Sequence, residues 1–154
     1  MKVMRGIVVV AALASALPAH AATTDPLQVI YLFSGVIDNG GSANAGVATS
    51  VHCTSFSSVT ETLQIVVRDE TSSVKGNANI PIPSSQSRTI STHSTLLHAE
   101  AALSTGALAP GALGVLSTSI NVVCTAQVLD ASSAVPSGFA LHPVRFSPIP
   151  GTQE

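Results

Sequence analysis

Four histidines, His52, His93, His98 and His142, are the side chains in the main body of the chain best suited to binding a ligand. Imidazole nitrogens bind transition metals, but a tight site needs at least three ligands that converge on one point. The chain has no H-x-H or H-E-x-x-H motif. His93 and His98 are five residues apart, which places them on opposite faces of a strand and well apart around a helix. We therefore expect surface imidazoles, and keep a small-ligand or metal carrier using these four histidines as the alternative function.

Patterns typical of catalysis are scarce. Only 9% of the residues are charged, and the carboxylates farthest from an obvious turn, Glu61 and Glu100, have no acidic partner at a spacing that suggests acid–base chemistry. The chain lacks the G-x-S-x-G elbow of a serine nucleophile, and its glycine-rich stretches lack the lysine of a phosphate loop. The sequence predicts a protein that is not an enzyme and has no cofactor.

The two cysteines, Cys53 and Cys124, each fall on the apolar side of an alternating segment, so both side chains should point into a core. In an exported chain two lone cysteines usually form a disulfide. Their wide separation in sequence suits a bridge between the two sheets of a sandwich, which would stabilise the fold by about 4 kcal/mol in the chain-entropy model.

The segment Met1–Ala21 has the three parts of a secretory signal peptide. These are the basic residues Lys2 and Arg5, the apolar run Gly6–Leu17, and the small-x-small sequence Ala19-His20-Ala21. The apolar run is shorter than the roughly 20 residues that span a bilayer, and no later stretch is long and apolar enough to do so. We expect cleavage after Ala21 or one residue later, and a single domain over 22–154 in the periplasm or outside the cell.

Removal of this segment changes the charge and the metal chemistry of the chain. Both methionines lie within it, so the mature chain has no thioether ligand for copper(I). The net charge of −2 becomes −4, because four basic residues remain against eight acidic ones. A chain without clustered lysines and arginines is not expected to bind nucleic acid.

Alternation of apolar and polar residues predicts β-strands through most of the mature chain. The expected strands cover 27–33, the region from Val47 to Thr54, the region from Leu63 to Arg68, 77–82, 88–93, one long strand over 116–128, and 139–146. Gly106–Gly114 is expected to be a loop, and Thr95–Leu103 is ambiguous because it contains helix-forming residues. Pro143 cannot donate a ladder hydrogen bond, which places the last strand at an edge or a break. About seven short strands predict an all-β, antiparallel β-sandwich.

The inward cysteines and their spacing resemble those of an immunoglobulin-type sandwich. The resemblance is one of architecture, because the chain has no Trp between the cysteines and has Val122 where a Tyr would precede the second cysteine. The composition, rich in Ser, Thr, Ala, Gly and Val, is also similar to that of bacterial fimbrial subunits, although both ends of the mature chain differ from theirs. Neither resemblance implies a functional residue.

The polar faces of the expected strands carry hydroxyl and amide side chains with few charges. Charged residues normally protect strand edges from pairing with other chains, and only Arg68, Lys75, Arg88 and Arg145 can do so in the mature chain. The sequence therefore predicts an exported structural or protein-binding module that contacts itself or another exported protein through its sheet edges.

Overall fold

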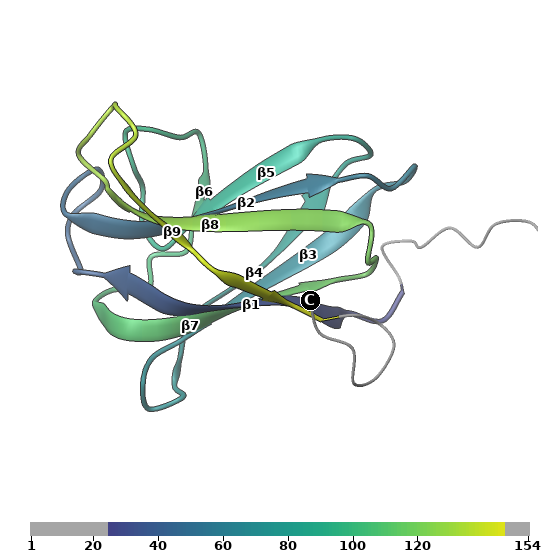
Figure 1. Cartoon of the computed structure of the whole chain (residues 1–154), viewed down its shortest axis with the longest axis horizontal. Helices are drawn as coiled ribbons and strands as arrows, with labels where there is room; N and C mark the ends of the chain where they lie inside the picture. Colours follow the sequence, from purple (N-terminus) through teal and green to yellow (C-terminus); the bar gives the residue numbers. More distant parts are fainter. Residues whose placement is uncertain (1–24, 147–154) are drawn as a thin grey trace, which may run out of the picture.

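Residues 25–146 are described by a computed structural model, in which they form two β-sheets of five strands each and no helix (Figure 1). The prediction of an all-β sandwich is confirmed for these residues, with ten strands where about seven were expected. The expected signal peptide, Met1–Ala21, lies outside the described residues.

The chain passes back and forth between the two sheets, so that each sheet contains strands from both halves of the chain. The first sheet, sheet A, has the order β10 (Pro143–Arg145), β1 (Gln28–Asp38), β7 (Leu108–Ser117), β3 (Glu61–Arg68) and β4 (Val74–Ile82). Sheet B has the order β6 (Ala101–Ala102), β5 (Ser87–Ser91), β2 (Val47–Ser55), β8 (Val122–Asp130) and β9 (Gly138–Leu141). Neighbouring strands are antiparallel except β5 and β6, which are parallel.

The core lies between the sheets and is built by the alternation seen in the sequence. In β3, Leu63, Ile65 and Val67 are fully buried, while the residues between them lie on the outer face of sheet A. Full burial of each such side chain contributes about 1.5–3 kcal/mol. Sheet B contributes Val51 and both cysteines, among others, to the same apolar cluster.

The expectation of a loop over Gly106–Gly114 is wrong, because β7 runs from Leu108 to Ser117 at the centre of sheet A. Pro110 is accommodated at a bulge, where the register shifts between the pairs Val36–Gly111 and Asp38–Leu108. Gly111 lies so close to β3 that a Cβ atom would overlap the carbonyl oxygen of Arg68. Pro110 and Gly111, which suggest a loop in the sequence, are therefore both part of one central strand.

The single long strand expected over 116–128 is also wrong. The chain leaves sheet A after Ser117 and enters sheet B at Val122, so that 118–121 crosses between the sheets. Side chains within the crossing satisfy its backbone, since Ser117 Oγ accepts from Ser119 N at 3.1 Å and Ser119 Oγ accepts from Asn121 N at 3.1 Å. Ser117, Thr118 and Ser119 are buried in succession. The inward positions are odd in β7 and even in β8, so the alternation is interrupted at the crossing.

The crossing also changes the role of the disulfide. Cys53 and Cys124 form the expected bond, and both are buried. They lie directly opposite each other on the neighbouring strands β2 and β8 of sheet B, with Cα atoms 4.1 Å apart. The prediction of a bridge between the two sheets is therefore wrong, because the sheet change at 118–121 puts the second cysteine beside the first.

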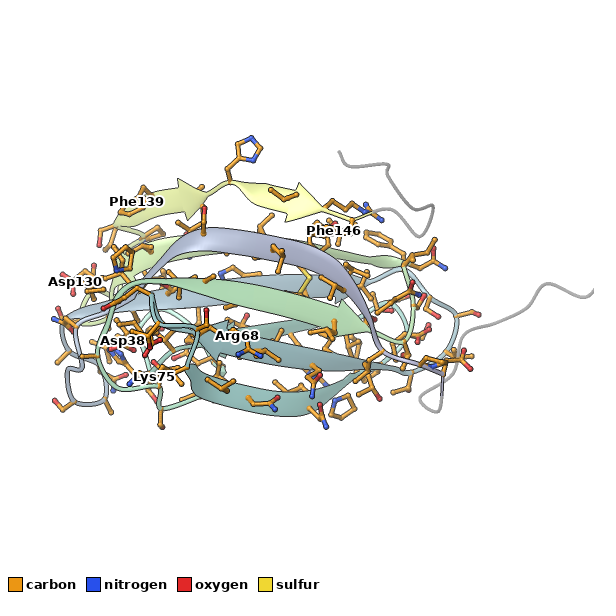
Figure 2. All side chains as sticks on the ribbon, turned by 90° about the horizontal axis from the view of Figure 1, so that it is seen from below. Asp38, Arg68, Lys75, Asp130, Phe139 and Phe146 are labelled. Carbon is orange, nitrogen blue, oxygen red and sulfur yellow. A yellow bond between two sulfur atoms is a disulfide. The ribbon has the colours of Figure 1, made fainter. Side chains whose placement is uncertain are left out.

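The C-terminal segment joins the two sheets at their edges. β9 pairs with β8 in sheet B and β10 pairs with β1 in sheet A, with Pro143 at the start of β10. The expected single strand over 139–146 is therefore broken at the proline, as its missing N–H predicts. Figure 2 shows Phe139 near one end of this segment and Phe146 near the other. The ambiguous segment Thr95–Leu103 contains no helix and only the two residues of β6.

Candidate functional site

The structure brings two of the four candidate histidines together and separates the others. His52 on β2 and His98, in the connection between β5 and β6, have ring centroids 4.4 Å apart and ring planes at 72°. His142 is exposed between β9 and β10, and its Nδ1 contacts the carbonyl oxygen of Pro143 at 3.1 Å. His93 is buried, so the expectation of four surface imidazoles is wrong for this residue.

His52 is positioned by the alternation of β2. Its neighbours Val51 and Cys53 point into the core, so His52 projects from the outer face of sheet B, where it is half-buried. Its strand partner on β5 is Thr89, and His52 Nδ1 lies 3.0 Å from Thr89 Oγ1. The ring is therefore held from below by the sheet and from above by His98.

Gln127 on β8 contacts both imidazoles through one atom. Its amide nitrogen lies 3.3 Å from His52 Nε2 and 3.1 Å from His98 Nε2. An amide nitrogen only donates hydrogen bonds, so both Nε2 atoms act as acceptors and carry no proton in this arrangement. Both imidazoles then hold their proton on Nδ1, and His52 Nδ1–H donates to Thr89. No sequence pattern singles out Gln127, which is a neighbour of His52 only because β2 pairs with β8.

The surroundings favour the neutral form of His52. Burial lowers the pKa of His52 below its ordinary value, and the positive charge that His98 can carry lowers the pKa further. The carboxylate of Glu100 acts in the opposite direction and is the smallest of the three effects. His52 is consequently an unprotonated nitrogen base at neutral pH.

Glu100 fastens the connection between β5 and β6 to the outer face of sheet B. Its Oε2 accepts from Ser91 Oγ at 2.6 Å and from Thr95 Oγ1 at 3.0 Å, and its Oε1 accepts from the backbone N–H of Thr95. Ser91 Oγ also lies 2.6 Å from Ser50 Oγ. These bonds hold His98 over His52. The Ser91 hydroxyl donates to the carboxylate and the Ser50 hydroxyl is partnered by Ser91, so neither is directed at an imidazole.

A second cluster, formed by Asp38 and His93, lies inside one end of the sandwich, the end where Figure 2 shows Asp38 and Asp130. His93 Nδ1 lies 2.7 Å from Asp38 Oδ2, and His93 Nε2 lies 3.0 Å from the carbonyl oxygen of Ala45. Asp38 also accepts from the N–H of Gly40 at 2.7 Å and from Thr105 Oγ1 at 3.3 Å. Both ring nitrogens thus face oxygen acceptors, and the cluster ties four chain segments together.

Glu61 is fully buried at the start of β3. Its Oε2 accepts from Thr118 Oγ1 at 2.6 Å, while its Oε1 has no hydrogen-bond partner within the described part of the chain. Thr118 Oγ1 also accepts from the N–H of Thr62 at 3.0 Å. The two carboxylates singled out from the sequence, Glu61 and Glu100, therefore accept hydrogen bonds from different residues.

The free edge of sheet A is the outer side of β4. Thr62 on β3 directs both its N–H and its C=O toward Thr118, which continues β7. Because backbone groups alternate along a strand, the neighbours of Thr62 on β3 face β4, and Leu63 and Ile80 are directly opposite each other. In β4 the residues on either side of Ile80, Asn79 and Pro81, therefore direct their backbone groups away from β3, and so does Asn77, two positions before Asn79.

This edge differs in length from the other three edges of the described fold. β6 has two residues, β9 has four and β10 has three, whereas β4 has nine. Short edge strands resist pairing with other chains, and so do Lys and Pro on an edge. In β4 the protecting residues are Lys75 and Pro81, and the stretch between them is open. An open groove of about 450 Å³ lies beside it, lined by Ile80 and by residues of β5 and 99–101.

The outer face of sheet A is unusually apolar at its centre. One row across the strands contains Val144, Leu32, Gly114 and Val66, and Leu32 and Val144 are about two-fifths exposed. A shallow groove of about 370 Å³ runs over Gly114 and is lined by Leu32 and Val66 among others.

Among residues 25–146, no three His, Cys, Asp or Glu side chains are grouped so that they could hold a metal ion. The same residues include no helix with the length and hydropathy to cross a membrane. Comparison of the chain with protein-family models, with curated proteins and with solved structures gives no match.

Proposed function

We propose that this chain is a non-enzymatic protein-binding module of an exported compartment, which binds by adding a strand at the free edge of β4. The observation that carries the proposal is the set of outward backbone groups of Asn77 and Asn79, on the longest edge strand of the described fold. Strand addition uses such unpaired N–H and C=O groups for affinity.

Export is supported by two independent features. The sequence Met1–Ala21 has the order of charge, apolar run and small residues typical of a signal peptide. The Cys53–Cys124 disulfide is compatible with an oxidising compartment, where such bonds persist.

The proposed occupant of the edge is β4 of a second copy of the chain, antiparallel to the first. With the twofold axis at Ala78, Asn77 of each copy is opposite Asn79 of the other. Residues that are opposite each other and both directed outward exchange two N–H···O bonds. The interface is self-complementary, as a twofold dimer requires.

The side chains of β4 fit this register. Ile80 would be opposite Gly76 of the second copy, where it would meet the side chains of Leu103 and Thr105 that lie against this glycine. Lys75 would be opposite Pro81 of the second copy, which separates the two lysines by six positions of the ladder, about 20 Å. The two cations are then farther apart than the Debye length of roughly 8 Å in physiological salt.

The experiment compares the oligomeric state of two variants at the same position. Asn79→Pro removes an N–H directed at the free edge and leaves the ladder to β3 intact, whereas Asn79→Ala retains that N–H. Light scattering coupled to size-exclusion chromatography of the oxidised protein should give a dimer for the wild type and Asn79→Ala, and a monomer for Asn79→Pro. A wild type that stays monomeric at high micromolar concentration contradicts the proposal.

A carrier of a metal ion is the second candidate function, because His52 and His98 converge on a single atom of Gln127. Both ring nitrogens of His93 face Asp38 and Ala45, and His142 lies on the exposed connection between β9 and β10, so neither belongs to this pair of imidazoles.

A further inference from the structure

The imidazoles of His52 and His98 present two unprotonated nitrogens to the same point. Their Nε2 atoms lie 3.3 Å and 3.1 Å from the amide nitrogen of Gln127. These residues come from β2, from the connection between β5 and β6, and from β8, so the fold and not local sequence brings them together. We infer that His52, His98 and Gln127 form a binding site for a divalent transition-metal ion, with Cu²⁺ preferred over Zn²⁺.

The ion takes the place now held by the amide N–H groups. Two imidazole nitrogens are its ligands, and rotation of the Gln127 amide by a half-turn replaces the nitrogen donor with Oε1 as a third ligand. Amide oxygen and imidazole are ligands that Cu²⁺ accepts, and solvent completes its coordination because all three side chains are only half-buried.

The tautomer needed for binding is already selected. His52 Nδ1–H donates to Thr89 Oγ1 at 3.0 Å, which leaves Nε2 free to bind the ion. A hydrogen bond of this kind from the second ring nitrogen is typical of metal-binding histidines, since it fixes the ring and raises its basicity.

Charge near the site favours a cation. The carboxylate of Glu100 is close enough to act on His52, and it is held in place by Ser91 and Thr95. The described part of the chain places no Lys or Arg in hydrogen-bond or ion-pair contact with these residues.

The preference for Cu²⁺ follows from the small number of protein ligands. A site with two imidazoles and one neutral oxygen imposes little geometry, so the intrinsic order of affinity applies, in which Cu²⁺ exceeds Zn²⁺ and Ni²⁺. The absence of methionine from residues 22–154 leaves the chain without thioether ligands for the reduced ion.

The test is a titration of the tag-free, oxidised protein with Cu²⁺ alone, followed by calorimetry and by electron paramagnetic resonance. We expect one equivalent of Cu²⁺ with hyperfine coupling to two imidazole nitrogens, and weaker binding of Zn²⁺. His98→Gln should weaken Cu²⁺ binding strongly, and Cu²⁺ that still binds at the site should show coupling to one imidazole nitrogen only. His142→Gln, which removes an exposed histidine elsewhere, is the matched control and should bind as the wild type does.

Two further variants separate a metal site from a merely structural cluster. Thr89→Val should weaken Cu²⁺ binding by roughly 10-fold without changing the number of nitrogen ligands, because it removes only the partner of Nδ1. Gln127→Glu should tighten binding, because a carboxylate replaces a neutral oxygen. Circular dichroism establishes that each variant is folded. The test relies on substitution of His98, which lies outside the strands, because substitution of His52 could disturb the sheet.

Three results overturn the inference. The first is a wild type that takes up no Cu²⁺ in a saturable manner. The second is a His98→Gln variant that binds Cu²⁺ as tightly as the wild type, which would place the ion elsewhere, for instance at the terminal amine. The third is binding of Zn²⁺ as tight as that of Cu²⁺, which contradicts the assigned ion. None of them affects strand addition at β4, which lies on the other sheet.

Discussion

Cys53 and Cys124 lie directly opposite each other on β2 and β8, with Cα atoms 4.1 Å apart. The disulfide therefore joins two strands that are already hydrogen-bonded neighbours, and the two sheets are held to each other by side-chain packing and by the chain connections. The bond still closes a loop of 71 residues in the unfolded chain.

Removal of this bond should lower stability without changing the fold. We expect the double variant Cys53→Ala, Cys124→Ala to lose about 2–4 kcal/mol of unfolding free energy, because the unfolded chain is no longer cross-linked. Urea denaturation of the variant and of the oxidised wild type measures the difference. Equal unfolding free energies of the two proteins would contradict this expectation, because they would mean that the disulfide does not restrict the unfolded chain.

The buried pair of Asp38 and His93 should be one of the most sensitive points of the fold. Asp38→Asn removes the charge that faces His93 Nδ1 and should cost about 3 kcal/mol, because a buried polar partner is left uncompensated. Asp130→Asn is the matched control, since this exposed carboxylate bonds only its own turn through Ser132. Thermal and urea melts should show a much smaller loss for the control, and similar losses for the two variants would contradict the structural role of the pair.

The hydroxyl of Thr118 satisfies two buried groups at once. Thr118→Val should cost about 2–3 kcal/mol, because Glu61 Oε2 and the N–H of Thr62 both lose their partner. Thr125→Val, on the exposed face of β8, should change stability by no more than about 0.5 kcal/mol. If both valine variants are as stable as the wild type, the crossing 118–121 does not depend on this hydroxyl.

Acid should weaken the fold through His52. Its pKa is lowered in the folded state, so the unfolded chain takes up the proton first as the pH falls below the ordinary value of about 6.5. The stability present above that pH is then lost progressively until the pH reaches the folded pKa. His52→Gln should remove this part of the pH dependence of the unfolding free energy, whereas His142→Gln should retain it. Proton NMR of the imidazole checks the cause, and a His52 pKa at or above 6.5 contradicts it.

Much of the fold is predictable because side-chain alternation is a local property. The inward positions of β2 and β3, the burial of both cysteines and the break at Pro143 all follow from period two and from the missing N–H of proline. The crossing could not be recognised from the pattern, because Leu116 and Ile120 extend the apolar even positions of β8, although Leu116 lies on the outer face of sheet A and Ile120 is exposed.

The candidate sites were less predictable because they depend on strand pairing. In β1 the buried residues switch from odd to even positions at Gly35, which has a positive φ of 78° beside a shift of register. Asp38 consequently points inward toward His93, against the parity set by Tyr31 and Phe33. His52, His98 and Gln127 likewise meet only through the pairing of β2 with β8 and the bonds of Glu100.

The central claim, strand addition at the edge of β4, is tested most directly by the mass of the oxidised protein in solution. Sedimentation velocity over a range of concentrations should show a reversible dimer for the wild type and for Asn79→Ala, and a monomer for Asn79→Pro. A dimer that persists unchanged in Asn79→Pro, or a wild type that is monomeric at every concentration, would contradict the assignment of β4 as the binding edge.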